Sequence, residues 1–175
     1  MVKKYSILIS IILLFNTYAQ AAGEVSVSDS AYKKGKDDQT YLIAKNSSYK
    51  KGLNAIKQAK KYEKKGKIDK SKKRFNDALK FFTLANEKNP GEPNILNYLG
   101  FTSRKIGDFA MAEIYYEQGL EIDPLHNGIN EYLGELYVQT NRIDKAKERL
   151  KVLENCNCDE FEELKAAIKK GSSKY

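Results

Sequence analysis

Apolar residues recur at helical spacing through most of the chain after about residue 50. Phe75, Leu79, Phe82 and Ala85 follow one another at intervals of 4, 3 and 3 residues, which places them on one face of a helix. The preceding segment has a similar stripe, formed by Leu53, Ile56, Ala59 and Tyr62. The pattern predicts a first helix from about Lys50 to Lys65 and a second from about Lys70 to Lys88, with Asp69 as its N-cap.

The pattern then repeats with a period of 34 residues. Three pairs of positions have this spacing. Leu99-Gly100 recurs as Leu133-Gly134, Ala112 recurs as Ala146, and Pro90 recurs as Pro124. A period of this length is typical of stacked helix-turn-helix units. We therefore expect an all-α fold, a short right-handed solenoid of about three helical hairpins. Asp108 and Asp144 are expected to cap the second helices of the later two hairpins.

The first hairpin can be aligned in two ways. Counting back 34 residues places Gly66 on Gly100 and Phe82 on Tyr116. The alternative aligns the segment starting at Gly66 with the segment starting at Asn141, and makes the second helix seven residues longer. Seven residues are close to two helical turns, so the apolar stripe stays on one face. We favour the longer helix.

The segment from Pro93 to Asp123 resembles the tetratricopeptide repeat family. The positions that match the family's motif are Leu96, Leu99, Gly100, Ala112, Tyr116, Gly119 and Pro124. Small residues at Gly100 and Ala112 allow the two helices of a hairpin to cross closely, and Pro124 ends the second helix because proline lacks the required NH group. Residues 127–153 repeat the pattern, with Leu150 in place of the aromatic residue and Cys158 in place of the proline.

The resemblance also implies a function, because the first helices of such repeats line a concave groove that receives a peptide or a partner helix. The positions that match this groove are Asn94, Asn97, Phe101, Arg104 and Lys105, followed by Glu131 and Glu135 of the next hairpin. Asparagine side chains can bond a peptide backbone, and Arg104 or Lys105 could meet a carboxylate. The alternative is that all seven are ordinary exposed polar residues.

The end of the chain predicts a cap helix. Asp159 and Glu162 have the spacing of a capping box, Phe161 begins an apolar face, and Gly171 follows the last lysines. A solenoid needs such a cap at its exposed end. The helical repeat domain is therefore expected to span residues 49–171, with a tail at 172–175.

The beginning of the chain predicts export. Lys3 and Lys4 precede an apolar run of signal-peptide length, and Ala19 and Ala21 suit a cleavage site. Residues 1–21 are therefore expected to be a signal peptide, and residues 22–48 a flexible leader with few apolar residues. The predicted location is the periplasm or the outside of the cell. A retained N-terminal anchor is the alternative.

The charge of the chain is concentrated in one segment. From Lys33 to Arg74 basic residues exceed acidic ones by 12, whereas from Phe75 to Tyr175 acidic residues exceed basic ones by 4. Export disfavours nucleic acid as the partner. The basic segment 50–74 could instead bind an anionic polymer or membrane surface, or be only a solvated lysine-rich helix. A protein or peptide is the expected partner, and self-association could cover the apolar ends of a short array.

Few residues suggest catalysis, and neither an enzyme activity nor a cofactor is expected. The one histidine, His126, falls in a turn between repeats, and no phosphate-binding loop or metalloprotease motif is present. Cys156 and Cys158 are the unusual feature. They could form a local disulfide, an exchanging thiol pair or a soft-metal site, or remain as two reduced cysteines. The metal site is the weak alternative, because zinc needs four ligands and two thiolates supply only two.

Overall fold

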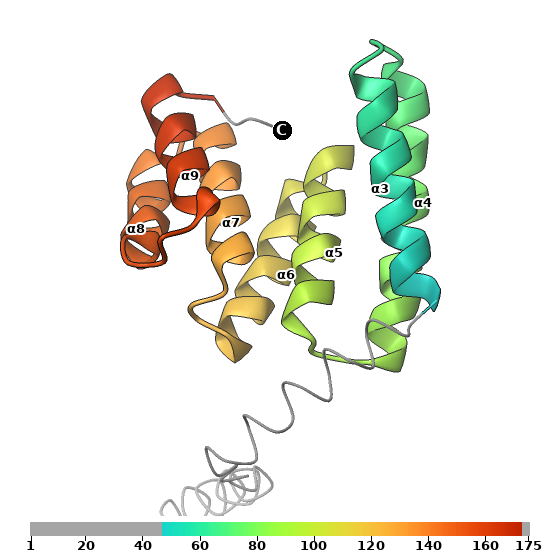
Figure 1. Ribbon diagram of the computed structural model, residues 1–175, viewed down its shortest axis with the longest axis horizontal. Coiled ribbons are helices and arrows are strands. Elements are labelled where there is room, and N and C mark those ends of the chain that lie inside the picture. The colour runs from blue at the N-terminus through green and yellow to red at the C-terminus, as the bar shows by residue number, and fades with distance from the viewer. Residues whose placement is uncertain (1–46, 173–175) are drawn as a thin grey trace, which may run out of the picture. The chain divides into compact units, whose positions relative to one another are not determined.

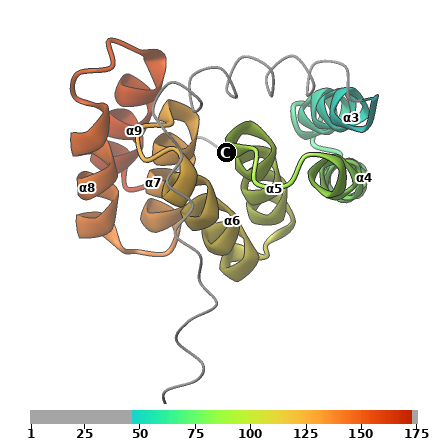
Figure 2. The same ribbon diagram turned by 90° about the horizontal axis from the view of Figure 1, so that it is seen from below.

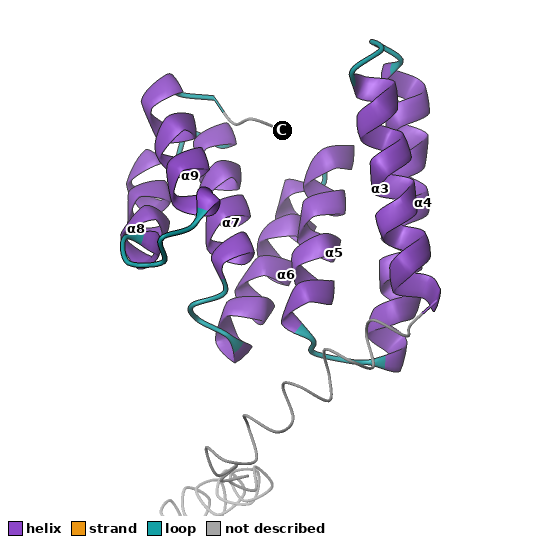
Figure 3. Cartoon of the chain, viewed as in Figure 1, coloured by secondary structure: helices purple, strands orange, loops and turns teal. Residues whose placement is uncertain are grey.

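The computed structural model describes residues 47–172 as a succession of seven helices (Figures 1 and 3). They are α3 (Ser47–Glu63), α4 (Ile68–Lys88), α5 (Pro93–Ile106), α6 (Phe109–Ile122), α7 (Asn127–Gln139), α8 (Ile143–Leu153) and α9 (Asp159–Lys170). The all-α prediction is confirmed. The predicted signal peptide, most of the predicted leader and most of the predicted tail lie outside the described residues.

The helices pair as three hairpins, α3 with α4, α5 with α6 and α7 with α8, and α9 packs on α7 and α8. Viewed along the helices, α3, α5 and α7 lie on the inner side of the array, and α4, α6 and α8 lie on its outer side (Figure 2). We call the surface formed by α3, α5 and α7 the inner face. The predicted helical-repeat solenoid is confirmed. No helix within residues 47–172 is long and apolar enough to cross a membrane.

The first hairpin is longer than the others, as the second alignment predicted. Helix α4 has 21 residues and α6 has 14. Gly66 and Asn141 both adopt left-handed backbone angles, with φ of 66° and 58°, and each lies two residues before the helix that follows. The 34-residue alignment still holds at the other end of α4, where Phe82 is buried like Tyr116. Each alignment is therefore correct for one end of this helix.

Close approach between a glycine and a large side chain recurs along the inner helices. A Cβ added at Gly52 would meet the ring of Phe82, one at Gly100 the ring of Tyr116, and one at Gly134 the side chain of Leu164. The first two contacts join the helices of one hairpin. The third joins α7 to α9, so the cap helix supplies the large side chain that we expected at Leu150.

One of the four predicted N-caps is correct. The carboxylate of Asp108 accepts a hydrogen bond from the NH of Met111 at 3.1 Å. The predictions for Asp69 and Asp144 are wrong, because the helices begin at the preceding isoleucines and leave both acids in the first turn. There they still suit the positive end of the helix dipole.

The prediction of a capping box at the start of the cap helix is also wrong. Asp159 is the first residue of α9, and the N-cap position belongs to Cys158, whose side chain makes no capping bond. The predicted end of this helix is correct, since Gly171 follows it with a left-handed φ of 66°.

Replacement of Gly100 by alanine should destabilise the domain. The added Cβ would overlap the fully buried ring of Tyr116, and overpacking of this kind costs roughly 1–3 kcal/mol. The helix propensity of alanine offsets up to about 1 kcal/mol. The matched control is Gly128→Ala, where the added Cβ overlaps only the end of the Asn97 side chain and makes ordinary contact with the His126 ring. Urea unfolding should give a lower midpoint for Gly100→Ala and an unchanged or higher one for the control; equal midpoints would contradict the packing argument.

Candidate functional site

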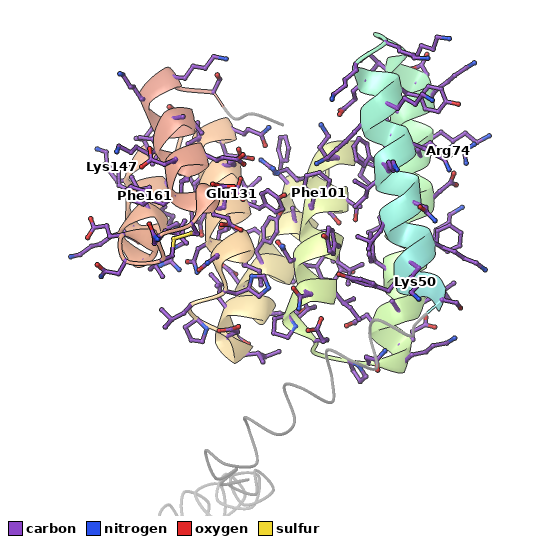
Figure 4. The ribbon with its side chains drawn as sticks, viewed as in Figure 1. Lys50, Arg74, Phe101, Glu131, Lys147 and Phe161 are labelled. Atoms are coloured by element: carbon purple, nitrogen blue, oxygen red, sulfur yellow. A yellow bond between two sulfur atoms is a disulfide. The ribbon has the colours of Figure 1, made fainter. Side chains whose placement is uncertain are left out.

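The residues predicted to line a groove converge on the facing sides of α5 and α7, but most lie below the surface. Phe101, Arg104 and Glu131 have exposed fractions of 1%, 3% and 3%, Glu135 of 0% and Asn97 of 7%. Phe101 and Glu131 lie at the same level of their adjacent helices (Figure 4). Asn94 and Lys105 are half-buried. The partner-binding role of all seven residues remains a prediction. The structure shows that five of them are buried.

Arg104 and Glu135 form a fully buried ion pair between α5 and α7. Arg104 Nη2 donates to Glu135 Oε2 at 2.8 Å, and Nη1 donates to the side-chain oxygen of Gln139 at 3.4 Å. The Arg104 guanidinium also lies over the ring of Tyr132, 5.6 Å from its centroid. Burial alone would lower the pKa of Arg104, but the surrounding acidic groups outweigh it and raise that pKa. Arg104 therefore remains a cation inside the domain.

Glu131, one turn before Glu135, is held in its protonated form. Burial raises the pKa of Glu131 to about 9, and a hydrogen bond with Glu163 of α9 and the negative charges of Glu135, Glu163 and Glu160 act in the same direction. A carboxyl group surrounded by other carboxylates is more stable when neutral. The Oε1 atom of Glu131 is buried and has no hydrogen-bond partner among the described residues.

Asn97 lies against the start of α7. A Cβ added at Gly128 would approach its side-chain nitrogen to 2.9 Å, so the glycine leaves room for the amide. The Oδ1 atom of Asn97 is buried and also lacks a hydrogen-bond partner within residues 47–172. The inner face of α5 and α7 therefore holds two buried acceptors that the described part of the fold leaves unused.

His126 has a structural role that its sequence position did not indicate. Its Nδ1 accepts a hydrogen bond from the NH of Ile129 at 3.2 Å and so caps α7. The other ring nitrogen is then protonated and lies 3.3 Å from the side-chain oxygen of Asn94. His126 therefore fixes the start of α7 and links it to α5. Histidine is not among the preferred N-cap residues, so the sequence carried no clear signal for this contact.

Helices α3 and α5 are joined by contacts that the sequence analysis missed. Lys105 Nζ lies 2.6 Å from Glu63 Oε1, and Lys60 lies over the ring of Phe101 at 5.2 Å from its centroid. These contacts depend on the extra length of α3, which brings its last turn beside the end of α5. Lysines of the basic segment thus take part in the inner face.

The basic segment divides between two helices. Two apolar residues of α3 and five lysines from the end of this helix and the turn after it border one surface hollow: Leu53, Ile56, Lys57, Lys60, Lys61, Lys64 and Lys65. The start of α4 carries the exposed Lys70, Lys72 and Lys73. The positive charge therefore extends over the whole end of the first hairpin.

Cys156 and Cys158 are joined by a disulfide in the turn between α8 and α9, with their Cα atoms 5.2 Å apart (yellow in Figure 4). Asn157 between them has a φ of 49°, a left-handed conformation that asparagine tolerates well. No group of three or more histidine, cysteine or acidic residues in the described part of the chain is arranged to hold a metal ion.

Stacked helical hairpins with a polar inner face define a helical-repeat protein. Residues 94–124 match the family model described as tetratricopeptide repeat, and this segment covers α5 and α6. This segment is therefore similar to the tetratricopeptide repeat family, which confirms the resemblance noted in its sequence. No curated protein matches the chain.

Several solved tetratricopeptide repeat domains are similar to this chain at low sequence identity. The first such domain of Spaghetti (RPAP3), bound to the HSP90 peptide SRMEEVD, is 20% identical, with a TM-score of 0.49 over 70% of this chain and 93% of that one. The second domain of human RPAP3, in complex with the HSP70 peptide SGPTIEEVD, is 14% identical, with a TM-score of 0.49 over 70% and 98%. The Arabidopsis OM64 domain is 12% identical, with a TM-score of 0.44 over 71% and 98%.

Removal of one partner of the buried ion pair should cost far more than removal of both. Arg104→Leu leaves Glu135 as an uncompensated buried charge, which costs about 3–5 kcal/mol. The double variant Arg104→Leu/Glu135→Leu replaces the pair by apolar side chains and should recover most of that loss. Urea unfolding of the two variants and the parent chain measures the difference. A double variant no more stable than the single one would contradict the assignment.

Because Glu131 is protonated in the folded domain, we expect the free energy of unfolding to depend on pH. In the unfolded chain Glu131 loses its proton near pH 4.5, whereas in the folded domain it keeps the proton up to about pH 9. The folded state binds more protons between these values, so the free energy of unfolding falls as pH rises, by at most about 1.4 kcal/mol per pH unit.

Glu131→Gln keeps a neutral side chain and should flatten this dependence between pH 5 and pH 8.5. Glu121→Gln, at an exposed position of α6, serves as the control and should leave the slope unchanged. Parallel slopes for the parent chain and Glu131→Gln would show that Glu131 is ionised in the folded domain.

Proposed function

We propose that this chain is a non-enzymatic protein-interaction module that binds a peptide or a segment of a partner protein across its inner face. The binding surface comprises the inner sides of α3, α5 and α7. The residues that line it from α5 and α7 are Asn94, Asn97, Phe101, Arg104, Lys105, Glu131 and Glu135. Asn97, Glu131 and the half-buried Asn94 and Lys105 make the polar contacts, while Phe101 and the Arg104–Glu135 pair hold the surface in shape.

One observation carries this proposal, the pair of buried acceptors that lack partners among the described residues. Asn97 Oδ1 and Glu131 Oε1 lie on adjacent helices of one face. A buried acceptor without a hydrogen bond costs about 1–3 kcal/mol, so such atoms in a folded domain need an explanation. An extended segment that displaces the side chains covering these two atoms supplies backbone NH groups to both and offsets this cost.

We also propose that the module acts in the periplasm or outside the cell. The basis is the predicted signal peptide at residues 1–21 and the proposed cleavage after Ala21. The disulfide between Cys156 and Cys158 is consistent with an oxidising compartment. Mass spectrometry of the protein from its native source tests the cleavage site.

Peptide-display selection against the full chain tests the binding proposal. Asn97→Leu removes the buried amide at nearly constant volume. It should lower the affinity for the selected peptides about tenfold, equivalent to about 1.4 kcal/mol. Gln118→Leu makes the same chemical change at an exposed position of α6 and should have little effect. Binding that responds to Gln118→Leu and not to Asn97→Leu would move the site away from the inner face.

The lysines support a second candidate function, that of an adaptor for an anionic polymer or membrane. Basic residues on both helices of the first hairpin, from Lys50 to Arg74, make this hairpin strongly positive. Contacts between exposed charges weaken as salt rises. Binding to an anionic polymer that disappears between low and high salt, and that Asn97→Leu leaves intact, would favour this candidate over the first.

A further inference from the structure

An exposed isoleucine, Ile68, begins α4 directly after the turn of the first hairpin. Its side chain is 64% exposed. Ile143 begins α8 at the matching place in the third hairpin, but it is half-buried and packs against the hydrophobic core. The extra length of the first hairpin explains the difference, because its turn extends beyond the turn between α5 and α6 (Figure 1). Ile68 therefore lies beyond the neighbouring helices that could cover it.

The residues on both sides of Ile68 are exposed and mostly basic. Every residue from Lys64 to Lys70 is exposed, and a Cβ added at Gly66 would meet no atom within 4 Å. These seven residues include four lysines and one acidic residue, Asp69. We call residues 64–70 the tip of the first hairpin. The tip combines one large apolar side chain with a concentrated positive charge.

The four lysines of the tip are not used to hold the domain together. Within residues 47–172 none of them forms an ion pair or lies over an aromatic ring. Glu63, the acidic residue just before the tip, is already paired with Lys105 of α5. The charge of the tip is therefore available to an anionic surface outside the domain.

We propose that the tip of the first hairpin attaches the domain to an anionic phospholipid bilayer. Ile68 enters the interfacial layer, while the surrounding lysines remain at the level of the lipid phosphates. Lysine suits this place because its apolar stem can lie against hydrocarbon while its ammonium group stays in water. Clustered basic residues are attracted to anionic headgroups. The inference rests on the second candidate function and adds both the segment that binds and the surface to which it binds.

The exposed isoleucine favours a bilayer over an anionic polymer. A polymer such as polyphosphate attracts the lysines but has no apolar phase for Ile68 to enter. A bilayer provides both, because headgroup charge lies directly above a region that accepts apolar side chains. One apolar side chain alone binds a membrane weakly, so both the lysines and Ile68 are needed, and binding should weaken as salt rises.

Tryptophan fluorescence tests whether Ile68 enters the lipid. The chain contains no tryptophan, so a single introduced one reports its own surroundings. Emission of Ile68→Trp should shift to shorter wavelength when phosphatidylglycerol vesicles are added to the full exported chain, because the ring leaves water. Leu125→Trp is the matched control, since Leu125 is 71% exposed in the turn between α6 and α7, and it should show no shift. Neutral phosphatidylcholine vesicles should shift neither variant.

Charge reversal tests whether the tip is the part that binds. Lys64→Glu/Lys67→Glu should weaken co-sedimentation with phosphatidylglycerol vesicles at least about tenfold. The matched control, Lys50→Glu/Lys88→Glu, makes the same change in net charge at the other end of the same hairpin (Figure 4) and should weaken it less than about threefold. All four lysines are exposed, and circular dichroism confirms that both variants fold.

The other outcomes overturn the proposal. Equal losses in the two double variants mean that total charge, and not the tip, attracts the vesicles. A shift in Leu125→Trp as large as that in Ile68→Trp means that the chain adsorbs without a preferred segment. No shift in Ile68→Trp, together with binding to polyphosphate, means that charge alone acts, and the second candidate function then survives as polymer binding. Binding to neither vesicles nor polyphosphate contradicts that function as well, and peptide binding through Asn97 is unaffected by all of these results.

Discussion

The close approach of each inner helix to one large side chain governs the rest of this structure. Glycine at positions 52, 100 and 134 removes the Cβ that would block Phe82, Tyr116 and Leu164. Each inner helix can then pack closely against the helix that bears this side chain. The third contact explains the cap helix, because α9 replaces the missing aromatic residue of the last hairpin and covers α7 from the exposed end.

Deep packing has a consequence for the polar residues of the inner face. Arg104, Glu131 and Glu135 would be solvated on an isolated helix, but between α5, α7 and α9 they are almost fully buried. Burial makes each charge costly unless it is paired or neutralised. The charges of Arg104 and Glu135 compensate each other in an ion pair, and Glu131 is neutral because it keeps its proton. A surface expected to be a simple polar groove is therefore a network whose stability depends on proton binding.

Charge divides the domain along the array. The first hairpin is strongly basic, and the following helices carry more acidic than basic residues. The basic hairpin is also the one with the extended helices, so its additional turns bear several of the lysines. The two parts of the array therefore differ in charge, with an excess of basic residues in the first hairpin and an excess of acidic residues from α5 to α9.

The sequence by itself determined the helical hairpins, their order and the longer first hairpin, because the 34-residue period and the apolar stripes are local properties of the chain. It also indicated Asp108 as a cap. Only the tertiary structure decided which polar residues are buried, since the exposure of Arg104 or Glu131 depends on helices more than 20 residues away in the chain. The caps at Asp69, Asp144 and Asp159 failed for a related reason. A shift of one or two residues in a helix start moves an acid from the cap into the first turn, and the turns at Gly66, Asn141 and Cys158 set those starts through backbone geometry that residue types alone do not specify.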